Sequence, residues 1–107
     1  MKYKYCLVIL LLVCQQTFSA DLTFNVVRVG VSDFSKTIFI ISDRDIAQTE
    51  CENKRQFKVP LDDAVYSSLV LSVAMQSVSI GKSVIVSYTP TSCIGDSQHV
   101  GNISIVK

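Results

Sequence analysis

The sequence lacks several features on which common chemistries depend. It contains a single histidine, His99, and no cysteines in a C-x-x-C spacing, so neither a metal-ligand cluster nor a redox-active dithiol is indicated. The segment "SIGKS" lacks the first glycine and the spacing of a phosphate-binding loop. No acid stands at a recognisable spacing from His99 to orient it as a base. The sequence therefore predicts a non-enzymatic protein with no catalytic residue, no metal site and no cofactor.

The N-terminal segment 1–19 has the layout of a secretory signal peptide. Lys2 and Lys4 give it a basic start, an apolar run extends from Cys6 to Cys14, and a polar stretch follows. The run is too short to span a bilayer. We expect cleavage after Ser19, which leaves a single domain over 20–107 in a secreted or periplasmic protein.

The remaining chain has no excess of basic residues. The whole sequence has 10 Lys and Arg against 9 Asp and Glu, and loss of Lys2 and Lys4 changes the net charge from +1 to about −1. Nucleic-acid binding needs clustered positive charge to neutralise phosphates. We therefore expect no nucleic-acid partner.

Cys51 and Cys93 are the two cysteines outside the predicted signal peptide. In an exported protein, a lone pair of cysteines is expected to form a disulfide. Such a bond closes a long loop and stabilises the domain by about 4 kcal/mol in the chain-entropy model.

Alternating apolar residues predict three strands, a helix and two further strands. The first strand is expected to bend, because its apolar face changes midway and each half must point inward. Leu22, Phe24 and Val26 share one face, whereas Val27, Val29 and Val31 share the other. The predicted elements are strands Leu22–Val31, Lys36–Asp43 and Lys54–Pro60, a helix over 61–80, and strands Ser83–Pro90 and Val100–Lys107.

This order, β-β-β-α-β-β, describes a mainly β domain with one helix. A long bent first strand and a helix between the third and fourth strands are typical of the five-stranded oligonucleotide/oligosaccharide-binding (OB) barrel. An α+β sandwich, with the helix laid across an antiparallel sheet, is the alternative.

The predicted helix has no charged residue from Ala64 to Gly81. An ordinary surface helix has a limited apolar stripe and a broad charged face. Three explanations compete: a membrane span, a helix enclosed by its own domain, or a helix covered by neighbouring copies. Five serines and a glutamine argue against the span, and we expect none in the mature chain. We favour a homo-oligomer with its interface at Leu71, Ala74, Met75 and Val78.

Two polar loops are the predicted ligand-binding surface. One is Ser42–Asn53, in which Asp43, Arg44 and Asp45 are the candidate ligand-binding residues, and the other is Thr89–His99. If Cys51 and Cys93 pair, the two loops are neighbours, and loops positioned by a rigid scaffold often bind ligands. The alternative is that both are solvated connections.

The segment "FKVPLDDAVYSSLVLSVAMQSVSIGKSVIVSY…C…VGNISIV" resembles a pattern in small exported bacterial proteins. An apolar strand is followed by a helix rich in Leu, Ala and Ser, then "GK-x-V-x-V", a cysteine and a final "ISI". The pattern looks like that of the receptor-binding B subunits of subtilase-cytotoxin and pertussis-like toxins. The resemblance implies an OB barrel, a disulfide, a ring of five subunits lined by helices, and glycan binding. It transfers no sugar-contacting residue to this chain.

The sequence thus predicts a secreted, non-enzymatic binding subunit that self-assembles into a ring and binds a glycan or a protein. A monomeric periplasmic inhibitor or accessory protein, acting through the Arg44–Asn53 loop, is the alternative.

Overall fold

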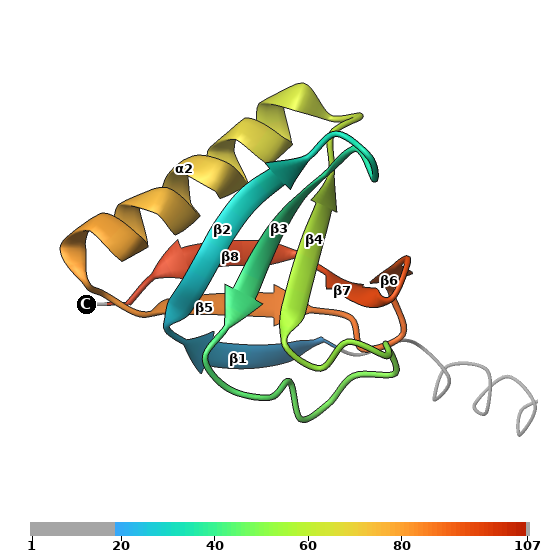
Figure 1. The fold of residues 1–107 in the computed structure, drawn as a ribbon. Helices are drawn as coiled ribbons and strands as arrows, with labels where there is room; N and C mark the ends of the chain where they lie inside the picture. The colour runs from blue at the N-terminus through green and yellow to red at the C-terminus, as the bar shows by residue number, and fades with distance from the viewer. Residues whose placement is uncertain (1–18, 107) are drawn as a thin grey trace, which may run out of the picture.

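A computed structural model describes residues 19–106, so the predicted signal peptide falls outside the described part. Within this range the chain forms eight strands and one helix (Figure 1). In chain order they are β1 (Ala20–Phe24), β2 (Val26–Ser32), β3 (Thr37–Ser42), β4 (Gln56–Pro60), α2 (Ala64–Ile80), β5 (Val84–Tyr88), β6 (Cys93–Ile94), β7 (Ser97–His99) and β8 (Asn102–Ile105). The predicted mainly β class with one helix is confirmed.

The strands form two sheets, one ordered β1-β5-β8 and the other β2-β3-β4-β7-β6. Neither sheet closes on itself, so the predicted closed barrel is not confirmed. Strands β2, β3 and β4 lie side by side in front of the smaller sheet (Figure 1). All pairings are antiparallel except that of β4 with β7, which is parallel.

The first predicted strand is divided at Asn25 into β1 and β2, which belong to different sheets. The predicted bend is therefore present, with a register shift between Val26 and Arg28. The prediction that Val27 and Val31 point inward is wrong, because they are 64% and 55% exposed. Val27 falls within the register shift, and β2 is an edge strand with a sheet neighbour on one side only.

The C-terminal half differs from the prediction mainly between β5 and β8. The segment expected to be a loop there contains a short hairpin, β6 and β7, which turns at Gly95 with φ of 60°. Strand β7 reads Ser97-Gln98-His99, so it has no apolar alternation that could have predicted it. Its partner is β4, which lies far away in the sequence.

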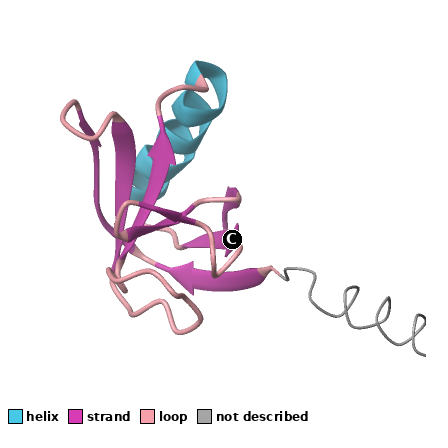
Figure 2. Cartoon of the chain, turned by 90° about the vertical axis from the view of Figure 1, so that its right-hand side faces the viewer, coloured by secondary structure: helices cyan, strands magenta, loops and turns pink. Residues whose placement is uncertain are grey.

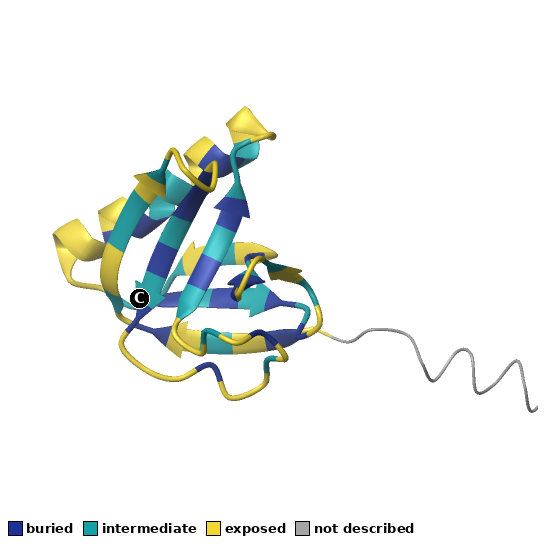
Figure 3. Ribbon diagram, turned by 45° about the vertical axis from the view of Figure 1, so that its right-hand side comes forward, coloured by how far each residue is buried: buried dark blue, intermediate teal, exposed yellow. Residues whose placement is uncertain are grey.

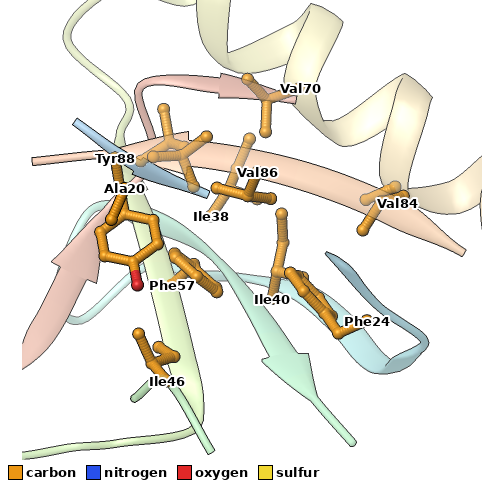
Figure 4. Packing of buried hydrophobic residues seen from close by; sticks show 13 residues of the cluster. Ala20, Phe24, Ile38, Ile40, Ile46, Phe57, Val70, Val84, Val86 and Tyr88 are labelled. Carbon is orange, nitrogen blue, oxygen red and sulfur yellow. The ribbon is translucent and has the colours of Figure 1, made fainter. Parts of the chain in front are cut away.

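The hydrophobic core lies between the two sheets and under the helix (Figure 4). Phe57 on β4 is its centre: the ring stacks on Phe24 of β1 at 5.3 Å between centroids and meets Tyr88 of β5 edge-on at 5.6 Å. The other buried apolar residues are Ala20, Ile38, Ile40, Ile46, Val59, Val70, Ala74, Val84, Val86 and Val100.

Helix α2 begins after Asp63, whose carboxylate accepts a hydrogen bond from the backbone N–H of Tyr66. It ends at Gly81, which has the left-handed conformation (φ 68°) that favours glycine at this position. The helix contacts β2 and β8, the edge strands of the two sheets, and so covers the open side between them. Figure 2 shows it at the end of the molecule opposite the long β3–β4 loop.

The helix packs on the sheets through small side chains. The buried positions are Ser67, Val70, Ala74 and Ser77. Small residues allow the helix axis to approach the strands closely, and they leave its larger apolar side chains on the other sides.

Ala74→Leu should therefore destabilise the fold. Ala74 is fully buried (0% exposed), and a larger side chain there would force the helix away from the sheets, at a cost of about 1–3 kcal/mol. Met75→Leu, one residue along and exposed, is the matched control. Urea unfolding monitored by circular dichroism measures both, and equal midpoints for the two variants would contradict the close packing.

Candidate functional site

The two loops predicted to bind a ligand do lie together. Cys51 in the β3–β4 loop is bonded to Cys93 at the start of β6, with an S–S distance of 2.01 Å and a Cα–Cα distance of 5.8 Å. The predicted disulfide is confirmed. A further link between the loops is the hydrogen bond from the backbone N–H of Glu50 to the carbonyl of Pro90, at 3.0 Å.

Gln98 on β7 links the same two loops from inside the protein, and its side chain is fully buried. Its amide nitrogen donates to the carbonyl oxygens of Thr89 (2.6 Å) and Ser92 (2.8 Å). Its amide oxygen accepts a 2.6 Å hydrogen bond from the hydroxyl of Thr49. A buried amide with these partners holds the loops in one arrangement, since each bond it loses leaves a polar group unsatisfied.

A pocket of about 390 Å³ lies between the fixed loops. Its walls are Ala47, Gln48, Thr49, Glu50, Thr89, Pro90 and Thr91. Methyl and methylene groups form much of its surface, and the side chains of Glu50, Gln48 and Thr91 are exposed. No Lys or Arg belongs to the described residues that line it. The pocket therefore suits a small ligand that forms hydrogen bonds and carries no negative charge.

Asp43, Arg44 and Asp45, the residues predicted from the sequence, do not line this pocket. The carboxylate of Asp43 accepts hydrogen bonds from the backbone N–H and side-chain amide of Asn25, at 3.0 and 3.2 Å. Asp45 accepts a hydrogen bond from Arg55 at 2.8 Å, and Arg44 lies 3.9 Å from Asp43. These three side chains instead join neighbouring segments, and their role in ligand binding stays a prediction.

The hydrogen bond from the Asn25 backbone holds the pKa of Asp43 below its ordinary value, and the side-chain amide of Asn25 and the charge of Arg44 add to the effect. Asn25 is the residue at which the chain passes from β1 to β2. The Asp43 carboxylate thus stabilises the connection between the two sheets.

The outward side of α2 is a second feature of the surface, and its uncharged residues are largely exposed (Figure 3). At about 100° per residue, they fall into three rows. A serine stripe of Ser68, Ser72, Gln76 and Ser79 runs along the middle, and Val65, which is 73% exposed, lies in the same row. The first flank is Leu69, Val73 and Ile80, and the second flank, on the opposite side, is Leu71, Met75 and Val78.

Both flanks expose apolar surface. Leu69 and Ile80 are 60% and 51% exposed, and Met75 and Val78 are 53% and 50% exposed. Of the four predicted interface residues, Leu71, Met75 and Val78 make up the second flank. Ala74 instead packs inside its own domain and is unavailable to another copy, because it points between the two sheets.

Other kinds of site find little support in the described residues. His99 lies on β7 and pairs with Lys58 in the parallel ladder. Within residues 19–106, no three His, Cys, Asp or Glu side chains are grouped so that they could hold a metal ion. In the same range, no helix has the length and apolar character needed to cross a membrane.

Comparison with known proteins finds no match: no protein-family model fits the chain, and no curated protein or solved structure is significantly similar to it.

Gln98→Met tests the buried link between the loops. Methionine has a similar size but cannot donate to the carbonyls of Thr89 and Ser92, which keep only their bonds from the backbone N–H groups of Ser92 and His99. It also removes the acceptor of the Thr49 hydroxyl, so we expect a loss of about 2 kcal/mol in unfolding free energy. Gln48→Met, in the exposed wall of the pocket, should have little effect. Urea denaturation of both variants with the disulfide intact makes the comparison, and a neutral Gln98→Met would refute the role given to Gln98.

Asp43→Asn should produce a stability loss that depends on pH. A carboxyl group with a lowered pKa in the folded state stabilises that state above its unfolded pKa, near 4, and the contribution disappears as the pH falls. The melting temperature of the variant should lie below that of the unsubstituted protein at pH 6.5, and the two should converge near pH 2.5. Asp33→Asn, which removes a carboxylate from the exposed β2–β3 turn, is the control. A difference that stays constant with pH would contradict this role of Asp43.

Proposed function

We propose that this protein is a secreted or periplasmic, non-enzymatic binding subunit that assembles into a closed ring through α2. The observation that carries the proposal is the distribution of side chains on the helix. Small residues face its own domain, and larger apolar residues occupy two separate exposed flanks. Exposed apolar surface of this extent commonly marks an interaction site.

The two flanks favour a ring over a simple dimer. A two-fold dimer buries one surface patch against the same patch of the partner, whereas a ring uses two different patches on each subunit. The first flank of one copy would pack on the second flank of the next. The serine stripe between the flanks would then face a central, solvent-filled axis, with Val65, 73% exposed, as an apolar member at its N-terminal end.

The resemblance to toxin B subunits supports the number of subunits and the architecture. It implies five copies whose helices line the centre, around OB-like barrels. In this chain the barrel strands would be the bent β1/β2 pair together with β3, β4, β5 and β8. The disulfide is compatible with export, because such bonds persist in oxidising compartments.

The ligand of the ring would be a glycan or another protein, bound at the pocket between Ala47–Glu50 and Thr89–Thr91. Because the disulfide and Gln98 hold both walls in place, little conformational entropy would be lost on binding. The hydroxyl, amide and carboxylate groups available there can donate and accept hydrogen bonds, as a ligand rich in hydroxyl or amide groups requires.

A monomeric inhibitor or accessory protein is the second candidate. The observation in its favour is the β3–β4 loop, a long polar segment anchored by Ile46 and Cys51, which are 1% and 2% exposed. A fixed loop of this kind resembles the elements with which small proteins block enzymes. In this case the apolar flanks would not mediate self-association.

Size-exclusion chromatography with light scattering on the oxidised, exported protein tests the ring. We expect a mass near five protomers for the unsubstituted protein. The double variant Leu69→Gln/Met75→Gln, with one substitution in each flank, should have the mass of one protomer. Ser68→Gln/Ser72→Gln, in the serine stripe, introduces the same side chains and should keep the assembly. An unsubstituted protein that is monomeric across the micromolar range would sink the ring and favour the inhibitor.

Mixing single-flank variants distinguishes a ring from a two-fold dimer. If the two flanks contact each other, the Leu69→Gln and Met75→Gln proteins each lose the ring. One interface remains intact in a mixture, because the first flank of the Met75→Gln protein can still pack on the second flank of the Leu69→Gln protein. An equimolar mixture should therefore form a mixed dimer, whereas each variant alone should not. Recovery of no mixed species would argue against contact between the two flanks.

A further inference from the structure

A second site lies on the outer face of the larger sheet, away from the helix and the loop pocket. The strand register places Arg28 of β2, Ile41 of β3 and Gln56 of β4 in one row across the sheet. The next row contains Gly30, Phe39 and Lys58. The core-facing residues on β3 are Ile38 and Ile40, so the two rows lie on the opposite face, which is turned away from the smaller sheet in Figure 1.

Phe39 forms a platform in the middle of this face. A Cβ atom built on Gly30 would stand 2.6 Å from the Cζ atom of Phe39, so the ring lies directly over this glycine. The guanidinium carbon of Arg28 is 5.5 Å from the ring centroid, which is a cation–π arrangement. A guanidinium held against an aromatic face keeps its N–H groups free at the edge to bind an oxyanion in bidentate fashion.

Lys58 supplies a second positive charge on the same face. Only 16% of its side chain is exposed, and its ammonium nitrogen lies 3.6 Å from the Asp96 carboxylate. Arg28, by contrast, makes no ion pair with any residue in the range 19–106. Asp96 therefore positions the ammonium group of Lys58, whereas the charge of the Arg28 guanidinium is available to a ligand.

The side chains enclose a cleft of about 280 Å³, lined by Arg28, Ser32, Ser35, Phe39, Ile41, Gln56 and Lys58. Guanidinium, ammonium, hydroxyl and amide groups all donate hydrogen bonds, and no carboxylate belongs to the described lining. This is the reverse of the loop pocket, whose wall includes a carboxylate and no cation. The two hollows must therefore prefer ligands of opposite charge.

We propose that this cleft binds a phosphate or sulfate ester carried on a ring. The tetrahedral oxyanion offers three acceptor oxygens directed to different sides, enough to engage Arg28, Lys58 and the neighbouring hydroxyl and amide donors together. The ring of the ligand lies against Phe39 and Ile41. This inference goes beyond the proposed function, since it uses neither the helix flanks nor the loop pocket.

Titration of the oxidised, ¹⁵N-labelled protein with phenyl phosphate, followed through its amide resonances, tests the site. We expect saturable shifts at Gly30, Phe39 and Lys58, weaker binding of inorganic phosphate, and no binding of benzyl alcohol, the neutral analogue. Arg28→Gln and Lys58→Gln should each weaken phenyl phosphate binding about tenfold or more, since each removes a charge-assisted hydrogen bond. Lys82→Gln, a lysine outside the cleft, is the control for general charge effects.

Gly30→Ala separates the platform from the charges. It should displace the Phe39 ring and weaken binding of phenyl phosphate while leaving that of inorganic phosphate unchanged. Glucose 6-sulfate and glycerol 3-phosphate distinguish the source of the oxyanion, and we expect the ring-bearing sugar sulfate to bind more tightly than the lipid-headgroup analogue.

Three results would overturn the proposal: phenyl phosphate causing no saturable shift at these residues, Lys82→Gln weakening binding as much as Arg28→Gln, or glycerol 3-phosphate binding as tightly as the sugar sulfate. Each can occur whatever mass the light-scattering experiment gives, so failure of this site and failure of the ring are separate outcomes.

Discussion

The packing of Phe57 between Phe24 and Tyr88 is the contact on which the rest of this fold depends. Among the described strands, no strand of one sheet is a ladder neighbour of the other sheet, so side-chain packing is the main contact between them, beside the connection at Asn25 and the hydrogen bond from the Val100 backbone N–H to the Lys58 carbonyl. Phe57 belongs to the larger sheet, whereas Phe24 and Tyr88 belong to the smaller one. Burial of these rings sets the distance between the sheets, and that distance determines where the edges of β2 and β8 leave an open side for the helix.

The way in which the helix fills that side accounts for its surface. The open side between the edge strands is narrow enough that Ser67, Ala74 and Ser77 face it, and the helix's larger apolar residues lie on its flanks. An isolated domain would be expected to bury Leu and Met and expose Ser. This helix does the reverse, since it buries Ser67 and Ser77 and exposes Leu69 and Met75. The proposed ring would account for this, because neighbouring copies would cover the flanks and solvent would cover the serine stripe.

The opposite end of the molecule is stabilised by other means. Few apolar side chains from the β3–β4 loop reach the core. The disulfide and the buried amide of Gln98, instead of apolar packing, therefore hold the two loops in position. The loop pocket has a carboxylate in its wall, whereas the cleft on the outer sheet face has two cations. A single subunit thus presents two hollows of different chemistry on surfaces that the proposed ring does not use.

Local pattern by itself determined much of this protein. Alternation predicted the main strands, the uncharged segment predicted the helix and placed its end closely, and the two cysteines predicted their bond. Tertiary structure decided the rest, because it depends on distant partners. Strand β7 exists through pairing with β4, Ala74 is buried because two sheet edges meet there, and the loop pocket follows from Gln98, a polar residue with no signal in its neighbours. Periodicity reports which side of an element is apolar, but only the packed fold decides what covers that side.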